Sequence, residues 1–311
     1  MSIGHFVLSL YIIHLMASPY FSVVIPCLNE EKYLPKLLTN LEKQTLKDFE
    51  VIVVDGQSED KTLAKATSFN NRLKIKTLKA DKRNVSFQRN LGAKNAKGDI
   101  LIFFDADTKI PKTFIAKVRA AFEKDKTDLL TTWIKTDSKL QTDKAIAIGL
   151  NSIFEFTNFF GSPSSVGAFI GIKKSVFEKI EGFDENLKFA EDTDLLERAV
   201  KEGFNFKISR DNYYYFSLRR FKKEGTLKSI RQYALLNLNR VLKIDKFTKL
   251  PDYEMGGHLF DGKTKKESLA WIQSSINKIT NQKNKKEILK PKGLSFLKSL
   301  WVDLLKEWEN L

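Results

Sequence analysis

The sequence predicts an α/β protein with a mostly parallel central sheet and helices on both of its faces. Short apolar segments alternate with segments of helical periodicity through the N-terminal third of the chain, an alternation typical of such sheets. Two of the apolar segments also end directly in an aspartate. The carboxyl ends of parallel strands meet at one edge of the sheet, where open α/β sheets bind their ligands. The sequence therefore predicts a site built from strand ends.

Four short strands are expected in this N-terminal part, because its apolar segments are rich in β-branched and aromatic residues. The first helix is expected after Asn29, which caps it, since acidic residues follow and leucines from position 34 to position 41 repeat with helical spacing. Pro111 stands at the favoured first position of another helix. The expected strands are Phe21–Ile25, Phe49–Val54, Leu73–Leu78 and Ile100–Phe104, and the other helices are Ser58 to about Phe69 and Val85–Ala96.

Beyond Asp128 the alternation is less regular. A strand is expected at Asp128–Ile134 and an apolar helix at Ile146–Phe160. Gly161–Gly171 is rich in small residues, which predicts a loop and a closely packed strand. This segment either serves packing alone or lines a substrate pocket, where small residues let the backbone approach a ligand.

The two ends of the chain each leave two interpretations open. His5–Ala17 is apolar, too short to span a membrane, and without the basic start of a signal peptide. It is either a short membrane anchor or an upstream misreading of the start, since Met16 lies just before the first strand. The amphipathic helix expected at Leu294–Leu311 carries two tryptophans and fits a bilayer interface or packing on the protein.

Composition limits the classes of partner. With 42% hydrophobic and 29% charged residues, the 311-residue chain is globular. Its net charge of +15 calls for anionic partners such as phosphorylated substrates or lipid headgroups. The sequence contains neither zinc-finger spacing nor an aromatic RNP-type strand, so no nucleic acid is expected. The single cysteine, Cys27, excludes an internal disulfide, fits a reducing cytosol and is expected to be buried filler.

Asp105 and Asp107 follow the strand expected at Ile100–Phe104. Two carboxylates at a sheet edge suit a hard divalent cation that also holds substrate phosphates. The plainer alternative is a polar turn that caps the strand. The other signals at strand ends favour the metal site.

These signals occur in a fixed order and resemble the family 2 glycosyltransferases, which have the GT-A fold. The resemblance covers roughly Tyr20 to Asp211 and includes the helical segment that begins Arg89-Asn90-Leu91-Gly92. The ordered segments are Pro26–Glu31, Asp55–Asp60, Asp105–Asp107 and Gly182–Phe204, the last containing Glu191-Asp192.

The resemblance implies a nucleoside-diphosphate sugar donor, with a uridine diphosphate sugar favoured. Residues that match Pro26, Asn29, Glu30 and Asp55 line the nucleoside pocket in the family. Many relatives have two consecutive aspartates where this chain has Asp55-Gly56, so contacts from the second position are in doubt.

Arg83 and Arg89 are candidates for the diphosphate, and the alternative for each is a solvated helix face. Asp105 and Asp107 match the family's ligands for Mg²⁺ or Mn²⁺. A cation there stabilises the charge that develops on the leaving diphosphate.

Asp192 matches the catalytic base, which deprotonates the acceptor hydroxyl for one inverting displacement. Glu191 beside it is a further substrate-binding candidate. These two carboxylates also suit a helix N-terminus, and both interpretations can hold together. His258, which follows two glycines, is a weaker candidate for the metal or diphosphate.

The resemblance also predicts the domain organisation. We expect an apolar extension at 1–18, a GT-A catalytic domain at 19–217, and a basic, amphipathic helical region at 218–311. Within the catalytic domain, 19–110 binds the nucleotide sugar and 111–217 faces the acceptor. The basic region starts at the cluster Arg219–Lys223, which covers the diphosphate or meets lipid phosphate, and helical sequence continues to about Lys243.

The chain lacks the Gln-x-x-Arg-Trp signature of processive synthases, so transfer of a single sugar is expected. The acceptor is expected to be a saccharide or a lipid-linked molecule of the cell envelope. The expected location is cytoplasmic, with peripheral contact at the inner membrane face. One alternative is a nucleotidyltransferase, against which stands the absence of a Gly-rich phosphate loop after Ile25. The other is a non-catalytic protein that binds sugar nucleotides or polyanions.

Overall fold

The computed structural model describes residues 18–124 and 126–224 continuously, and a few isolated positions between 229 and 241. The chain divides into two compact units, residues 1–219 with 249–261 and residues 220–248 with 262–311. The central sheet lies in the first unit. His258, the extension up to residue 17 and the expected helix at Leu294–Leu311 fall outside the described residues.

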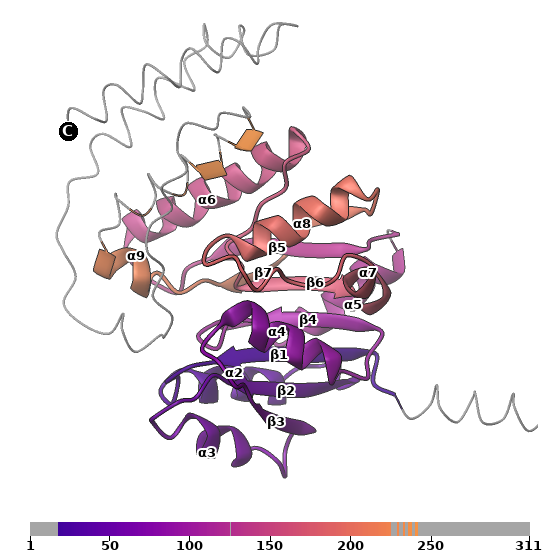
Figure 1. Ribbon diagram of the computed structural model, residues 1–311. Coiled ribbons are helices and arrows are strands. Elements are labelled where there is room, and N and C mark those ends of the chain that lie inside the picture. Colours follow the sequence, from indigo (N-terminus) through magenta and orange to yellow (C-terminus); the bar gives the residue numbers. More distant parts are fainter. Residues whose placement is uncertain are drawn as a thin grey trace, which may run out of the picture. The chain divides into compact units, whose positions relative to one another are not determined.

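The first unit is built on a seven-stranded sheet with strand order β3-β2-β1-β4-β6-β5-β7. The first four of these strands can be followed upward from β3 in Figure 1. Strand β6 runs antiparallel to both of its neighbours, and the remaining pairs are parallel. The expected α/β fold with a mostly parallel sheet is therefore confirmed. The strands are β1 Phe21–Cys27, β2 Phe49–Asp55, β3 Ile75–Lys79, β4 Ile100–Phe104, β5 Leu129–Lys135, β6 Phe169–Lys173 and β7 Phe206–Tyr215.

Helices connect these strands and cover the sheet (Figure 1). Helix α4 packs on β1 and β2, α6 on β5, and α7 on β6. The described helices are α2 Leu34–Glu42, α3 Thr62–Thr67, α4 Val85–Lys94, α5 Phe114–Lys124, α6 Gln141–Phe159, α7 Lys174–Lys179, α8 Glu191–Lys201 and α9 Arg219–Glu224. None of the helices that the structure describes is long and apolar enough to cross a membrane.

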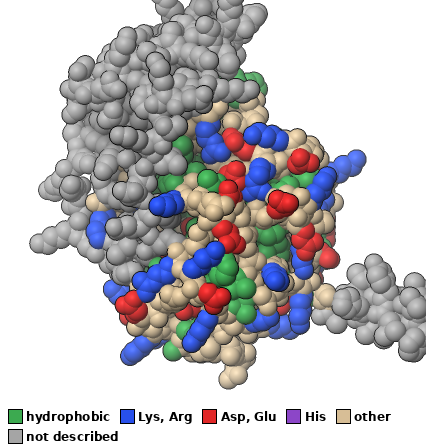
Figure 2. Space-filling view, in the orientation of Figure 1, with side chains coloured by type: hydrophobic (Ala, Val, Ile, Leu, Met, Phe, Trp, Pro, Cys, Tyr) green, Lys and Arg blue, Asp and Glu red, His purple; other side chains and the backbone are tan. Residues whose placement is uncertain are grey.

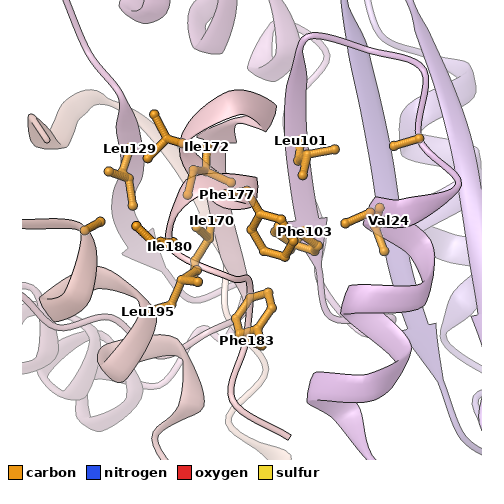
Figure 3. Packing of buried hydrophobic residues seen from close by; sticks show 14 of the residues in the cluster. Val24, Leu101, Phe103, Leu129, Ile170, Ile172, Phe177, Ile180, Phe183 and Leu195 are labelled. Carbon is orange, nitrogen blue, oxygen red and sulfur yellow. The ribbon is translucent and has the colours of Figure 1, made fainter. Parts of the chain in front are cut away.

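Adjacent residues of β4 form the centres of two hydrophobic cores, because successive side chains of a strand point to opposite faces. The ring of Phe103 lies 5.4 Å from that of Phe177 and 5.1 Å from that of Phe183, in the core beneath α4, α7 and α8 (Figure 3). The ring of Phe104 lies 5.6 Å from that of Phe114 on α5. Both faces of β4 are thus buried, which explains why its sequence is an unbroken apolar run.

The first helix starts later than the sequence predicts. It begins at Leu34, because Asn29 has a left-handed backbone with φ of 55° and its polar groups bind the loop after β2 instead of capping a helix. The backbone N–H of Asn29 donates to Ser58 Oγ at 2.9 Å, and its Oδ1 accepts from the backbone N–H of Glu59 at 2.8 Å. The two loops that follow β1 and β2 are therefore joined at the edge of the sheet.

The helix expected from Pro111 likewise begins three residues later, at Phe114. The Pro111 carbonyl accepts from the side-chain amide of Gln44 at 2.8 Å and from the backbone N–H of Phe114 at 3.1 Å. This segment therefore forms a turn anchored to the end of α2 before the helix starts.

Candidate active site

The candidate site lies where the carboxyl ends of β1, β2 and β4 meet the N-terminus of α8 and the loop before β6. It contains most of the polar side chains singled out from the sequence. Acidic and basic side chains are interspersed over the face of the molecule shown in Figure 2. The described residues therefore show no patch of a single sign of charge on that face (Figure 2).

Asp105 and Asp107 lie in a tight turn that follows β4. The backbone N–H of Asp105 donates to the Ala168 carbonyl at 3.3 Å, and the Asp105 carbonyl accepts from the N–H of Thr108 at 3.0 Å. The Thr108 hydroxyl donates to the same Ala168 carbonyl at 3.2 Å. These bonds tie the turn to the segment that enters β6 and hold both carboxylates at the sheet edge.

Each of these carboxylates is paired with an arginine. Asp105 Oδ1 accepts from Arg89 Nη2 at 3.0 Å, and Asp107 Oδ2 accepts from Arg219 Nη2 at 2.7 Å. Partial removal from water raises the pKa of Asp105 to about 7, and the charge of Arg89 opposes this shift. The side chain of Asp105 is still 37% exposed. The Asp107 carboxylate raises the pKa of Arg219 against the effect of burial, so this guanidinium stays charged.

Arg89 connects three parts of the site. Its Nη1 donates to Glu191 Oε1 at 2.8 Å, and its Nη2 donates to Asp105 and to the Gly167 carbonyl, the latter at 3.4 Å. Only 3% of its side chain is exposed. The sequence left this arginine open between the diphosphate and a solvated helix face. The structure places it inside the protein, between β4 and α8.

Helix α4 can bring Arg89 to this position because Gly92 lets the helix lie close to the sheet. A Cβ on Gly92 would be 2.3 Å from Val24 Cγ1 of β1 and 3.2 Å from Val54 Cγ2 of β2. Real side chains do not approach so closely, so a larger residue would push α4 outward. Close packing of α4 on the sheet thus explains why glycine stands at position 92, one of the residues that carry the family resemblance.

Glu191 and Asp192 are the first two residues of α8. Both carboxylates suit a helix N-terminus, as was expected from the sequence. Asp192 Oδ2 accepts from Ser165 Oγ at 3.0 Å, and Ser165 Oγ also accepts from the backbone N–H of Gly167 at 3.1 Å. Burial and the neighbouring Glu191 raise the pKa of Asp192 to about 6, more than Arg89 and Ser165 lower it. A carboxylate in this state is ionised at neutral pH and can take a proton.

Asp55 ends β2, and one of its carboxylate oxygens has no hydrogen-bond partner among the described residues. Its Oδ2 accepts from the backbone N–H of Ser58 at 3.2 Å, so this oxygen is the buried Oδ1. Because an unpaired buried polar atom is costly, this oxygen suits a donor group on a bound molecule.

Gln88 explains why glycine follows Asp55. The fully buried Gln88 amide donates to the Cys27 carbonyl at 2.9 Å and to the Val54 carbonyl at 2.8 Å, so it bridges the ends of β1 and β2. A Cβ on Gly56 would lie 2.9 Å from Gln88 Nε2. The amide thus fills the space that a second aspartate would need, and sequence reasoning did not single it out.

The remaining candidates from the first strand lie at the same edge. Pro26 is paired in register with Val54 within the sheet, and the backbone N–H of Glu30 donates to Thr62 Oγ1 at 2.7 Å. Glu30 Oε2 lies 3.7 Å from Arg219 Nη2. The side chain of Arg83 is 46% exposed and bonds to Glu59 and to the Gln57 carbonyl, so it lies at the rim.

Ser165 and Arg219 were not predicted as site residues, although their segments were noticed. Ser165 belongs to the small-residue stretch Gly161–Gly171, for which lining a pocket was one of two interpretations. Arg219 starts the basic cluster Arg219–Lys223. The sequence pattern marks both segments, but only the fold shows which residue of each reaches a carboxylate.

The donor atoms at the β4 turn fit a divalent cation bound together with a phosphate ligand. Within the described part of the chain, no group of three or more His, Cys, Asp or Glu side chains is placed to hold a metal ion by itself. Asp105 and Asp107 each keep a second carboxylate oxygen with no hydrogen bond from the described residues. Two carboxylates with substrate phosphates and water are a usual ligand set for Mg²⁺.

Carboxylates at the strand ends of a mostly parallel sheet, beside a buried carboxylate at a helix N-terminus, are typical of α/β proteins that bind a ligand at this edge. A model of the family "Glycosyl transferase family 2" matches residues 22–181, just over half of the 311 residues. The chain belongs to this family.

Several known proteins are similar to this chain. Poly(ribitol-phosphate) beta-N-acetylglucosaminyltransferase TarS of Staphylococcus aureus is 29% identical over 211 residues, 64% of this chain but only 36% of the relative. The chain thus matches little more than a third of the length of this curated relative.

Two solved structures share the fold. The structure of S. aureus TarS 1-349 in complex with UDP-GlcNAc is 23% identical, with a TM-score of 0.53 over 70% of this chain and 66% of that one. The mannosyltransferase PcManGT from Pyrobaculum calidifontis, in complex with GDP-Man and Mn²⁺, is 15% identical, with a TM-score of 0.55 over 93% and 87%. The expected GT-A-like fold is confirmed.

Proposed function

We propose that this glycosyltransferase moves a single sugar from a UDP-sugar to an acceptor hydroxyl, with inversion at the anomeric carbon and with a divalent cation. The observation that carries the proposal is the placement of Asp192. It is a buried carboxylate held by Ser165 and linked through Glu191 and Arg89 to the Asp105 turn. This connection supports the assignment of Asp192 as a proton acceptor near a turn that suits a diphosphate.

The ends of β1 and β2 form the proposed nucleoside pocket. The unpaired Asp55 Oδ1 would accept a hydrogen bond from the base or ribose of the donor. Pro26, Asn29 and Glu30 complete this edge. The relative TarS, whose structure was solved with UDP-GlcNAc, supports uridine as the base.

Asp105 and Asp107 are the proposed ligands of Mg²⁺ or Mn²⁺ against the donor diphosphate. When bound, the cation would supply Lewis-acid stabilisation of the negative charge on the departing nucleoside diphosphate. Arg89 would not touch the diphosphate. It would hold Asp105 and the start of α8 at a constant separation, with its donors directed to Asp105, Glu191 and Gly167.

Asp192 is the proposed catalytic base. It would accept the proton of the acceptor hydroxyl as that oxygen attacks the anomeric carbon and the bond to the diphosphate breaks. Ser165 donates to Asp192 Oδ2 and so fixes the direction of the carboxylate. The segment before β6, to which Ser165 belongs, would form one wall of the acceptor site.

The proposed acceptor is a saccharide or lipid-linked molecule of the cell envelope, modified at the cytoplasmic face of the membrane. The relative TarS, by its name, acts on poly(ribitol-phosphate). A polyanionic acceptor of this kind would also suit the net charge of +15.

The test is binding and slow hydrolysis of a panel of UDP-, GDP- and dTDP-sugars, with and without Mn²⁺. We expect one UDP-sugar to bind in a Mn²⁺-dependent manner, and the Asp107→Ala variant to lose that dependence because one of two protein ligands is removed. Isothermal titration calorimetry measures the binding, and release of UDP measures the hydrolysis. Absence of metal-dependent binding to every donor would contradict the proposal and favour a non-catalytic polyanion-binding protein.

The rate of transfer should depend on the ionisation of Asp192. Because the pKa of Asp192 is raised to about 6, the base is ionised above pH 6 and becomes protonated below it. We expect kcat/KM to fall about tenfold per pH unit on the acidic side of an apparent pKa near 6. A pH profile at saturating Mn²⁺ measures this, and a flat profile down to pH 4.5 would exclude Asp192 as the base.

A further inference from the structure

The guanidinium of Arg219 lies against one carboxylate oxygen of Asp107, which is a proposed ligand of the cation. Arg219 Nη2 lies 2.7 Å from Asp107 Oδ2 and 3.7 Å from Glu30 Oε2. The guanidinium carbon lies 3.5 Å from the centre of the Tyr33 ring. The side chains of Arg219 and Asp107 are 18% and 21% exposed, so solvent screens their attraction only in part.

We propose that Arg219 is an internal counter-ion of the donor-free protein. It neutralises Asp107 until donor and metal arrive together, and it prevents a divalent cation from binding there alone. This inference rests on the proposed function, because it requires that Asp107 binds the cation of a metal–diphosphate complex.

A divalent cation that binds to Asp107 without a diphosphate must either overcome repulsion from Arg219 or displace it. A guanidinium does not lose its proton in proteins, so Arg219 cannot avoid repulsion from a divalent cation by becoming neutral. The negatively charged diphosphate compensates the added positive charge only when it enters with the cation. Glu30, the second carboxylate near Arg219, gives the displaced guanidinium an anionic partner within the same site.

The competing role and a purely structural role of Arg219 predict opposite changes in Mn²⁺ binding when Arg219 is replaced. If the ion pair served only to hold Asp107 in place, its loss would weaken Mn²⁺ binding under all conditions. If Arg219 competes with the cation, its loss strengthens Mn²⁺ binding in the absence of donor. The sign of the change therefore distinguishes the two roles.

The experiment measures free Mn²⁺ by electron paramagnetic resonance during titration of the full chain, with and without UDP. For Arg219→Gln we expect about tenfold tighter Mn²⁺ binding without UDP, since one charge-assisted hydrogen bond no longer competes. With UDP present, the gain should disappear. Arg219→Lys keeps the charge and should stay within about threefold of the wild type.

Arg210→Gln is the matched control, because it removes one positive charge from an exposed pair with Glu155. It should leave Mn²⁺ affinity unchanged in both conditions. Unchanged or weaker donor-free Mn²⁺ binding by Arg219→Gln, with normal binding in the presence of UDP, would overturn this inference alone. If neither the wild type nor the variant binds Mn²⁺ with UDP, the proposed function fails together with it.

Discussion

Asp192→Asn should reduce sugar transfer by at least about 100-fold while leaving donor binding intact, because a positioned general base contributes about 10² to 10⁴ to the rate. Asparagine has nearly the same shape and can still accept the hydrogen bond of Ser165 through its amide oxygen. It cannot take a proton at neutral pH. The measurement is kcat with the donor found in the panel, together with the Kd for UDP and Mn²⁺.

The fold should survive this substitution. Burial raises the pKa of Asp192, which means that the charged form is less favourable in the folded protein than in the unfolded chain. A neutral amide therefore removes no stabilising charge, and the melting temperature should not fall.

Asp194→Asn is the control for Asp192→Asn. Asp194 also lies in the first turn of α8, but its carboxylate pairs with Arg198 at 2.8 Å. This variant should retain transfer within about threefold, since an i,i+4 pair of this kind contributes only a few tenths of a kcal/mol. Equal loss in both variants, or retained transfer in Asp192→Asn, would exclude Asp192 as the base. Full donor binding without any transfer in the wild type would instead favour a non-catalytic protein.

Arg89→Gln should destabilise the protein by about 3 kcal/mol and remove most of its activity, because it leaves the buried Glu191 and the partly exposed Asp105 without their counter-ion. Arg89 is 2% exposed and lies between Asp105 and Glu191. Without it the two carboxylates repel each other and α8 loses its link to the β4 turn. Denaturant unfolding measures the loss of stability, and Mn²⁺·UDP affinity measures the effect on the site.

A second substitution separates charge from packing in this prediction. In the double variant Arg89→Gln, Glu191→Gln, one of the uncompensated carboxylates is gone, so stability should partly recover relative to Arg89→Gln. A cavity or a strained helix would not be relieved by Glu191→Gln, and an additive loss would therefore contradict the counter-ion role. Arg72→Gln, which breaks an exposed pair with Glu42, should cost no more than about 1 kcal/mol.

The sequence predicted the N-terminal half of the sheet closely because the information there is local. The strand Ile100–Phe104 has the same bounds in the structure, and the strand expected at Phe49–Val54 extends by one residue to Asp55. A short apolar run followed by a carboxylate specifies both the buried strand and the end from which polar side chains emerge. The position of Asp105 and Asp107 at the sheet edge follows from the same pattern.

The C-terminal half of the sheet was harder to predict, because the order of its strands depends on contacts between segments that are distant in the sequence. Nothing local in Phe169–Lys173 distinguishes an antiparallel strand from a parallel one, and its direction depends on its place between β4 and β5. Strand β7 was not predicted. Its partner β5 lies far away in the chain, and the register between them shifts after Thr132.

By itself, the amino-acid sequence determined the class of fold and the set of carboxylates at the strand ends, since apolar periodicity and strand-end residues are local properties. The ordered motifs indicated the family by resemblance. Only the tertiary structure decided how those carboxylates are paired. Arg89 could have faced solvent on an isolated helix, yet Gly92 lets α4 bring it into the interior. Arg219 meets Asp107 across 112 positions of the chain. The pKa of Asp192 likewise depends on burial and neighbouring charges, which exist only once the chain is packed.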